Sequence, residues 1–440
     1  MSRDFHEIRH PTGRFGLHGE ARTASGRGYL GTGKGNRHQP WKLSSALLVS
    51  LLLLQVQAQQ LKFQAPPANQ KWSRKSDDTP TPLIITNNCP DPVWPGIGTQ
   101  NGIGPGTGGF TLSSTLSVQL WVSPNWQGRV WGRTNCSFNE DGTGPSNLNG
   151  VNGNGAACLT GDCFGVLDCA YSGQVPTTLA EFNLIGGYEG RQTFYDISLV
   201  DGYNLPLGIV YLPAQNTTWI PPNLTNCACI ASAGFLSEPA RSGLAYTNST
   251  YPIPYESYQN NAAVANWCPW DLQEYPPSKP GDGIYPYPDD NIQRPSFDPC
   301  LSACSATRNP ADCCTGDYNS PGACRPSYYS SQAKMVCPDA YSYAFDDQTS
   351  TFIIPTGGGW QVVFCPEGRS TNILQVFGDQ MRALGSGRNL SMERILEVTR
   401  NKTFIELERP MVGGALSGPR VSGLDVVMVG LVVSWMVWVF

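Results

Sequence analysis

The sequence predicts a mainly β protein with a sandwich or barrel-like core of short strands and a loop-rich lobe held together by disulfides. Short runs of alternating or β-branched residues recur between turns in a chain that carries 48 Gly and 36 Pro among 440 residues. Fifteen cysteines lie between Cys89 and Cys365, which indicates an oxidising compartment and a disulfide framework. Only 14% of the residues are charged.

The N-terminal part of the chain is expected to precede the folded domain. Residues 1–43 are polar and Arg-rich with no apolar period, and we interpret them as a disordered basic leader. Residues 44–58 contain a nine-residue apolar core, too short to span a bilayer, followed by small residues suited to cleavage after Ala58. A signal peptide is the favoured interpretation, and a buried core helix or a signal anchor is the alternative. Residues 59–80 are expected to be a linker.

The strand pattern begins near Leu83. Strand-like runs occupy 82–89, 109–123, 128–138, 178–184, 194–201, 207–213 and 359–365. The runs at 178–184 and 194–201 are separated by a polar Gly-rich turn and predict adjacent antiparallel strands. Asp196 and Asp201 are an odd number of residues apart, so they can reach one site only if the chain turns near Val200. Asp201-Gly202 is a suitable turn dipeptide.

Two insertions interrupt the strands, a Gly/Asn-rich one before Cys158 and a Tyr/Pro-rich one between Cys229 and Cys300. Residues 300–337 read as a small lobe held by disulfides. Residues 367–412 lack cysteine and contain helix-compatible stretches, so a partly helical stalk outside the core is expected. The predicted N-glycosylation sites are Asn216, Asn223, Asn248, Asn389 and Asn401.

Residues 413–440 have the pattern of a GPI-anchor signal. Small residues from Gly413, the expected ω site, precede a spacer and a mostly apolar tail that ends at Phe440. The alternative is a C-terminal transmembrane helix that carries Asp425 near its start. The favoured interpretation is a secreted, extracellular protein on the outer leaflet of the plasma membrane or in the cell wall.

Composition excludes several classes of function. All four histidines lie before residue 39, so a Ser-His-Asp or Cys-His catalytic site in the folded region is excluded. The cysteine spacing does not fit a zinc site, and we expect no metal or cofactor. Between Thr81 and Cys365 there are 9 Lys/Arg against 22 Asp/Glu. This acidic balance disfavours nucleic acid and anionic lipid as partners but is compatible with a neutral sugar. We expect a monomer.

Several sequence segments resemble segments of a known protein family. TGDC, PTTLAEF and FYDISLVDGYNLP, with WGRTNCSF, CPDAYSYAFDD and VVFCPEG in the expected order, resemble the thaumatin-like protein family over about Leu83 to Cys365. The resemblance implies a thaumatin-like domain over residues 81–366. Its fold would be a flattened antiparallel β-sandwich with a disulfide-rich loop domain and an acidic cleft between them.

The resemblance also implies a disulfide pattern. The implied pairs are Cys89–Cys365, Cys136–Cys158, Cys163–Cys169, Cys229–Cys337, Cys268–Cys300, Cys304–Cys313 and Cys314–Cys324. The family's eighth bridge would join Cys227 to a cysteine at the position that Ile354 occupies here. Cys227 is therefore expected to be a free thiol, unless it competes with Cys229 for Cys337.

A five-residue signature of one arginine, one glutamate and three aspartates marks the acidic cleft of many family members. We match it to Arg133, Glu181, Asp196, Asp201 and Asp339. The resemblance implies β-1,3-glucan as the ligand and, for some members, weak endo-β-1,3-glucanase activity in wall remodelling. Glycoside hydrolysis needs a carboxylic acid and a carboxylate, and we assign Glu181 as proton donor and Asp201 as nucleophile or base. Arg133, Asp196 and Asp339 would bind the substrate.

The alternative is a non-catalytic glucan-binding or defence-type protein that uses the same cleft. Structural interpretations of individual residues stand beside these assignments. Arg133 can tie strands to an acidic partner, and Asp201-Gly202 can be only a turn. Asp162 is expected to cap a turn, and Asp346-Asp347 to lie in a solvated loop.

Overall fold

The computed structural model describes residues 61–66, 79–145, 155–214, 220–237, 259–274, 299–388 and 390–391. The predicted leader, signal peptide and GPI signal lie outside these residues. So do the two large insertions, for the most part, and the sequons at Asn216, Asn248, Asn389 and Asn401. None of the helices in the described ranges is both long and apolar enough to cross a membrane.

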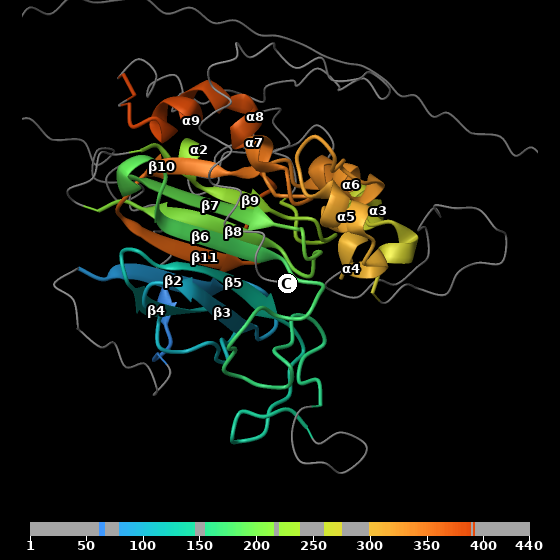
Figure 1. Cartoon of the computed structure of the whole chain (residues 1–440). Helices are drawn as coiled ribbons and strands as arrows, with labels where there is room; N and C mark the ends of the chain where they lie inside the picture. The colour runs from blue at the N-terminus through green and yellow to red at the C-terminus, as the bar shows by residue number, and fades with distance from the viewer. Residues whose placement is uncertain are drawn as a thin grey trace, which may run out of the picture. The chain divides into compact units, whose positions relative to one another are not determined.

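Two β-sheets form the body of the protein (Figure 1). One has six strands in the order β1 (Lys62–Phe63), β4 (Leu116–Val122), β2 (Thr81–Asn87), β11 (Gly359–Phe364), β8 (Leu207–Leu212) and β9 (Cys227–Cys229). The other has five strands in the order β10 (Phe352–Pro355), β7 (Gln192–Ser198), β6 (Leu179–Gly186), β5 (Gln127–Arg133) and β3 (Trp94–Asn101).

The pairing is antiparallel throughout the five-stranded sheet, and the predicted hairpin of β6 and β7 is present. The six-stranded sheet also contains two parallel pairs. β11 runs parallel to β2, with Trp360 opposite Leu83, and β1 runs parallel to β4. β1 lies in the segment expected to be a linker, so that segment adds a short edge strand to the sheet.

The sandwich core follows from the alternation of side chains along the strands. Ala180, Phe182 and Leu184 of β6 are buried in the main hydrophobic cluster, whereas the odd-numbered positions of that strand point to the other face. Trp360 of β11 lies at the centre, with ring centroids 5.4 Å from Phe182 and 4.6 Å from Tyr195. Aromatic packing of this kind fixes the two sheets against each other.

Short helices gather around the strands. Helices α3 to α6 lie together at one end of the strands in Figure 1, and α7 to α9 lie near β10. The helices are α2 (Pro222–Thr225), α3 (Asn261–Asn266), α4 (Ala303–Thr307), α5 (Pro310–Cys313), α6 (Tyr328–Val336), α7 (Asp347–Ser350), α8 (Ile373–Val376) and α9 (Gly378–Gly385). The 3-10 turns are η1 (Tyr188–Gly190), η2 (Trp270–Leu272) and η3 (Gly316–Tyr318).

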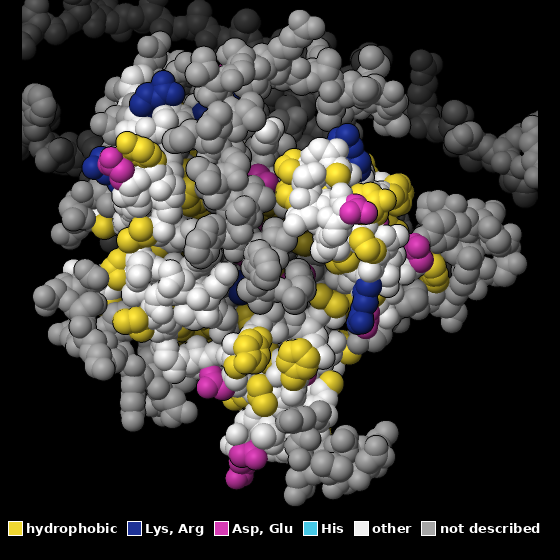
Figure 2. All heavy atoms as spheres, in the orientation of Figure 1, with side chains coloured by type: hydrophobic (Ala, Val, Ile, Leu, Met, Phe, Trp, Pro, Cys, Tyr) yellow, Lys and Arg dark blue, Asp and Glu magenta, His cyan; other side chains and the backbone are white. Residues whose placement is uncertain are grey.

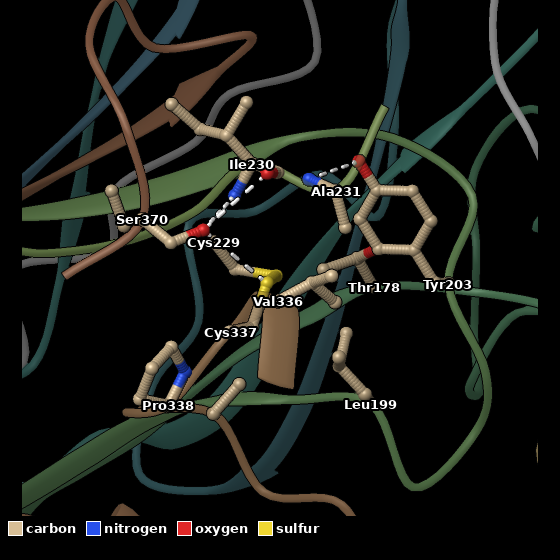
Figure 3. Close-up of a disulfide and its surroundings, with 12 residues drawn as sticks. Thr178, Leu199, Tyr203, Cys229, Ile230, Ala231, Val336, Cys337, Pro338 and Ser370 are labelled. Carbon is tan, nitrogen blue, oxygen red and sulfur yellow. Dashed lines mark hydrogen bonds between the residues drawn. A yellow bond between two sulfur atoms is a disulfide. The ribbon is translucent and has the colours of Figure 1, made fainter. Parts of the chain in front are cut away.

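Seven disulfides hold these parts together, and they are the seven pairs that the family resemblance implies. Figure 3 shows Cys229–Cys337, which joins β9 of the six-stranded sheet to the end of α6 in the lobe. Ser370 lies beside it, and its hydroxyl accepts a hydrogen bond from the Ile230 amide at 2.8 Å. Cys227 is free and buried.

The first part of the segment expected to be a stalk belongs to the folded body. Residues 367–388 pack on the body, and Ile373, Phe377, Met381 and Leu384 belong to the main hydrophobic cluster. The expectation of a segment outside the core from residue 367 is therefore wrong for this stretch. Helix α8 buries Ile373, and α9 buries Met381 and Leu384. The lack of cysteine in this segment did not indicate that it lies outside the core.

Candidate functional site

Three charged side chains form a row across the outer face of the five-stranded sheet. Arg129 on β5 lies opposite Glu181 on β6, and Glu181 lies opposite Asp196 on β7. All three occupy the strand positions that alternate with the core positions Val130, Ala180 and Ile197, so they point away from the sandwich core. Strands lie about 4.8 Å apart, so these side chains are direct neighbours.

Arg129 and Glu181 form an ion pair, with 3.3 Å between Nη2 and Oε1. Both side chains reach solvent, with 31% and 23% of their surface exposed. Arg129 Nη1 also donates to Ser172 Oγ at 2.9 Å. Ser172 follows the Cys163–Cys169 disulfide in the chain, so the loop held by that disulfide borders the row of charges.

Asp196 is the buried member of the row, with 5% of its surface exposed. Burial, followed by the neighbouring Glu181 carboxylate, raises the pKa of Asp196 well above its usual value. Among the described residues, no group donates a hydrogen bond to its Oδ1. A protonated Asp196 removes the repulsion that two carboxylates on opposite strand positions would otherwise create.

Asp201 reaches the same charges from the turn that follows β7. The Gly202 amide donates to Leu199 O at 3.0 Å, so the chain turns at Val200 as its spacing predicted. Burial and the Glu181 carboxylate raise the pKa of Asp201 to about 6, and Arg129 opposes this shift. The carboxyls of Asp196 and Asp201 are thus coupled to the same glutamate and the same arginine.

Asp347, at the start of α7, is the fifth member of this group. Its Oδ1 accepts a hydrogen bond from Tyr341 Oη at 2.8 Å, and its charge contributes to the raised pKa of Asp196. The segment around Tyr341 runs beside the end of β7, because the Tyr341 amide donates to Ile197 O at 2.8 Å. We call Arg129, Glu181, Asp196, Asp201 and Asp347 the acid cluster.

Arg133 was assigned to this site from the sequence, and that assignment is wrong. Its side chain is fully buried and donates to four backbone carbonyls, those of Trp94, Pro95, Val166 and Leu167, at 2.7–3.0 Å. Burial lowers its pKa to about 10. Arg133 lies four residues beyond Arg129 on β5, about 13 Å along the strand. Arg133 joins the disulfide loop to β3 and β5, and Arg129 is the arginine that lies beside Glu181.

Asp339 was also assigned to the site and instead anchors the C-terminal segment. Its two carboxylate oxygens accept hydrogen bonds from the amides of Ile373 and Leu374 at 2.8 and 2.9 Å. The expected solvated loop at Asp346-Asp347 is likewise wrong. Asp346 is buried and pairs with Lys334 Nζ at 3.0 Å, which leaves Asp347 to face the acid cluster. Asp162 caps a loop as expected, accepting from the amides of Ala157, Cys158 and Gly165.

The cluster therefore contains one arginine, one glutamate and three aspartates, although two of its members differ from those matched from the sequence. Alternation along β5 places Arg129 and Arg133 on the same face, so the register with β6 was needed to choose between them. The chemistry that the group offers is hydrogen bonding to polar ligands, together with two aspartate carboxyls of raised pKa beside the Arg129–Glu181 ion pair. Within the described ranges, no group of three or more His, Cys, Asp or Glu side chains is placed to hold a metal ion.

Comparisons with known proteins agree with this fold. The sequence model of the Thaumatin family matches residues 87–366. "Pathogenesis-related thaumatin-like protein 3.5" of Cryptomeria japonica is 36% identical over 290 residues, which cover 65% of this chain and 90% of the relative. "Glucan endo-1,3-beta-glucosidase" of Prunus avium is 36% identical over 287 residues, which cover 64% and 90%.

Among solved structures, that of a thaumatin-like xylanase inhibitor is 32% identical and covers 29% of this chain and 74% of its own, with a TM-score of 0.22. The family match spans more than half of the sequence and includes the strands that carry the acid cluster. This chain belongs to the thaumatin family.

Proposed function

We propose that this protein binds β-1,3-glucan or a related neutral wall polysaccharide through the acid cluster. The observation that carries the proposal is the row of Arg129, Glu181 and Asp196, extended by Asp201, on the outer face of the sheet. Guanidinium and carboxylate groups that reach solvent can bond sugar hydroxyls as donors and acceptors. One relative bears the name of a glucan endo-1,3-beta-glucosidase, which supports the choice of ligand.

A second function, weak hydrolysis of the bound glucan, is supported by the pKa of about 6 at Asp201. A carboxyl that holds its proton near pH 6 can protonate a leaving oxygen, while Glu181, which is paired with Arg129, can act as nucleophile or base. This reverses the roles expected from the sequence, because Asp201 is the group with the raised pKa. The competing proposal is a defence-type protein that binds glucan without cleaving it, in keeping with a relative named pathogenesis-related.

Glucan binding and glucan cleavage are separated by two measurements on the secreted protein. Sedimentation with insoluble β-1,3-glucan reports binding, and reducing-sugar release from laminarin reports cleavage. Glu181→Gln is expected to weaken binding and to abolish any cleavage, and Asp201→Asn is expected to abolish cleavage while glucan is still bound. Glu189→Gln is the matched control, because Glu189 is exposed and pairs with Arg191 in the β6–β7 turn.

Binding by the wild type without sugar release would leave the glucan-binding function and exclude the hydrolase. No sedimentation of the wild type with insoluble glucan would contradict the proposed function itself. Equal loss in Glu189→Gln would show that general acidity, rather than the acid cluster, determines binding.

We further propose that the protein is secreted and held on the plasma membrane by a GPI anchor at Gly413. The motivation is the sequence pattern of residues 413–440, together with seven disulfides that require an oxidising compartment. Phosphatidylinositol-specific phospholipase C is expected to release the protein from cells. Retention after this treatment, with the C-terminal peptide intact, would instead identify a transmembrane tail. Of the proposed glycosylation sites, Asn223 lies in the described residues, on the partly exposed helix α2.

A further inference from the structure

The loop between β5 and β6 exposes an unusual amount of large apolar surface. Four side chains between Cys158 and Val175 are exposed: Leu159 by 44%, Phe164 by 60%, Tyr171 by 77% and Val175 by 40%. Figure 2 shows hydrophobic side chains gathered over the region where Figure 1 draws the loops that follow β5. Exposed apolar side chains that gather in this way are typical of a binding surface.

Phe164 lies in a turn that does not favour a large side chain. The Val166 amide donates to Cys163 O at 3.3 Å, and both central residues of the turn have positive φ, 55° at Phe164 and 76° at Gly165. Turns with positive φ at both centres prefer Asn or Gly at the first position, because a Cβ is crowded there. The chain therefore keeps an exposed aromatic ring where a smaller residue would suit the backbone better.

Tyr171 precedes, in the chain, a residue that contacts the acid cluster. This residue is Ser172, whose hydroxyl accepts the hydrogen bond from Arg129, so the loop and the row of charges share a border. The loop is held in place by the disulfides Cys136–Cys158 and Cys163–Cys169 and by the three amides that donate to Asp162. A ring presented on such a fixed loop loses little conformational freedom on binding.

The charges of this loop favour an uncharged partner. Residues 134–175 contain four acidic residues, Glu140, Asp141, Asp162 and Asp168, and no Lys or Arg. Such a surface repels anionic lipid headgroups and nucleic acid. Neutral sugar rings carry no charge and present C–H faces that pack against aromatic rings, while their hydroxyls can reach the carboxylates.

We propose that Phe164 and Tyr171 stack against successive sugar rings of a neutral polysaccharide and extend the acid cluster into a longer binding surface. This inference rests on the proposed function, since it assigns to the same ligand a second set of contacts. It predicts that a long chain of sugars binds more tightly than the acid cluster alone would allow.

The test is the affinity of the full secreted protein for insoluble β-1,3-glucan, measured by depletion. Tyr171→Ala and Phe164→Asn are each expected to raise the Kd by about threefold to tenfold, the range of a single aromatic contact. Tyr188→Ala is the matched control, because Tyr188 is 67% exposed but lies beyond the far end of β6 from Glu181. The melting temperature of Phe164→Asn is expected to be no lower than that of the wild type, because Asn suits the turn.

Other outcomes overturn the inference. If Glu181→Gln loses affinity while Tyr171→Ala and Phe164→Asn bind as the wild type does, the loop is not part of the surface although the proposed function stands. If the wild type does not bind glucan at all, the proposed function fails and this extension fails with it. An equal loss of glucan affinity in Tyr188→Ala would also overturn it. So would binding of the wild type to phosphatidylcholine vesicles that Tyr171→Ala and Phe164→Asn lose while their glucan affinity is unchanged.

Discussion

Arg129 and Glu181 lie opposite each other on β5 and β6, and their ion pair is the centre of the acid cluster. Arg129 is the basic member of the cluster, and it opposes the rise in the pKa values of Asp196 and Asp201. The charge balance of the whole group therefore depends on one partly exposed guanidinium. Arg133 lies on the same face of the same strand but bonds backbone carbonyls instead of a carboxylate, so its removal is expected to affect a different property.

Arg129→Met and Arg133→Met are expected to have opposite effects on binding and stability. Loss of Arg129 removes a donor to the sugar and the partner of Glu181, so glucan affinity should fall about tenfold, as loss of one charge-assisted hydrogen bond does. The free energy of unfolding should change by no more than about 1 kcal/mol, because the pair is partly exposed. Depletion binding and urea unfolding measure the two quantities.

Arg133→Met serves as the counterpart on the same strand. It leaves four carbonyl oxygens without their donor and removes the stacking of the guanidinium over Phe138, so the free energy of unfolding should fall by about 3 kcal/mol or more. Protein that still folds should bind glucan as the wild type does. A stable Arg133→Met protein that has lost glucan binding would show that Arg133 belongs to the binding site.

The raised pKa of Asp201 predicts how stability depends on pH. Because its folded pKa of about 6 lies above the value of an unfolded aspartate, the folded state holds more protons between about pH 4 and pH 6. The free energy of unfolding should therefore fall as pH rises through this window. Asp201→Asn should flatten the decline and raise the melting temperature at pH 7 relative to the wild type.

Asp141→Asn provides the control for this titration. Hydrogen bonds from Thr143 lower the pKa of Asp141, so this group stays ionised from pH 4.5 to pH 7.5 and contributes no slope there. Melting temperatures at pH 4.5, 6 and 7.5 are the measurement. An Asp201→Asn protein whose melting temperature follows the same course as the wild type would show that Asp201 titrates normally.

Many strands and turns could be predicted from the sequence, because local residue patterns specify them. The alternation in 178–184 and 194–201 predicted β6 and β7, and the turn dipeptide Asp201-Gly202 predicted the bend that brings Asp201 to the site. The pairing of strands from distant segments could not be predicted in this way. The parallel contact of β11 with β2 joins residues almost 280 positions apart, and no local pattern specifies it.

The members of the site that are close together in the sequence were predicted correctly, and those from distant segments were not. Glu181, Asp196 and Asp201 come from one stretch of chain and were found together, whereas Arg133 and Asp339 were matched from separate segments. In each case a second residue of the same charge stood nearby, Arg129 or Asp347, and only tertiary register shows which one faces the cluster. Asp339 is directed elsewhere because the buried amides of α8 require acceptors.

Asp339→Asn tests this structural role. An amide oxygen can accept from one of the two backbone amides, so the other loses its acceptor and the free energy of unfolding should fall by about 1–3 kcal/mol. Glucan affinity should not change, because the carboxylate does not belong to the acid cluster. Asp347→Asn is the matched comparison, for which affinity should fall while stability changes little. If Asp339→Asn lowers the glucan affinity and Asp347→Asn does not, Asp339 rather than Asp347 belongs to the binding site.

The free thiol of Cys227 allows the missing eighth disulfide to be rebuilt. Cys227 and Ile354 are both fully buried in the main hydrophobic cluster, and burial raises the pKa of the thiol well above its usual value. Ile354→Cys is expected to form a disulfide with Cys227. Because this disulfide would close the long loop between the two positions in the unfolded chain, it should raise the free energy of unfolding by about 2–4 kcal/mol. Thiol titration of the denatured protein should find no free cysteine.

Ile353→Cys is the control for this bridge. Ile353 is the preceding residue of β10, and its side chain points toward Gly385 on α9, so a cysteine there faces away from Cys227. This variant should titrate with two free thiols after denaturation and show no gain in melting temperature. In the wild type the buried Cys227 should react with a thiol reagent only after unfolding, since the thiolate is strongly disfavoured in the core. Two free thiols in denatured Ile354→Cys would show that β10 and β9 do not bring these positions within bonding distance.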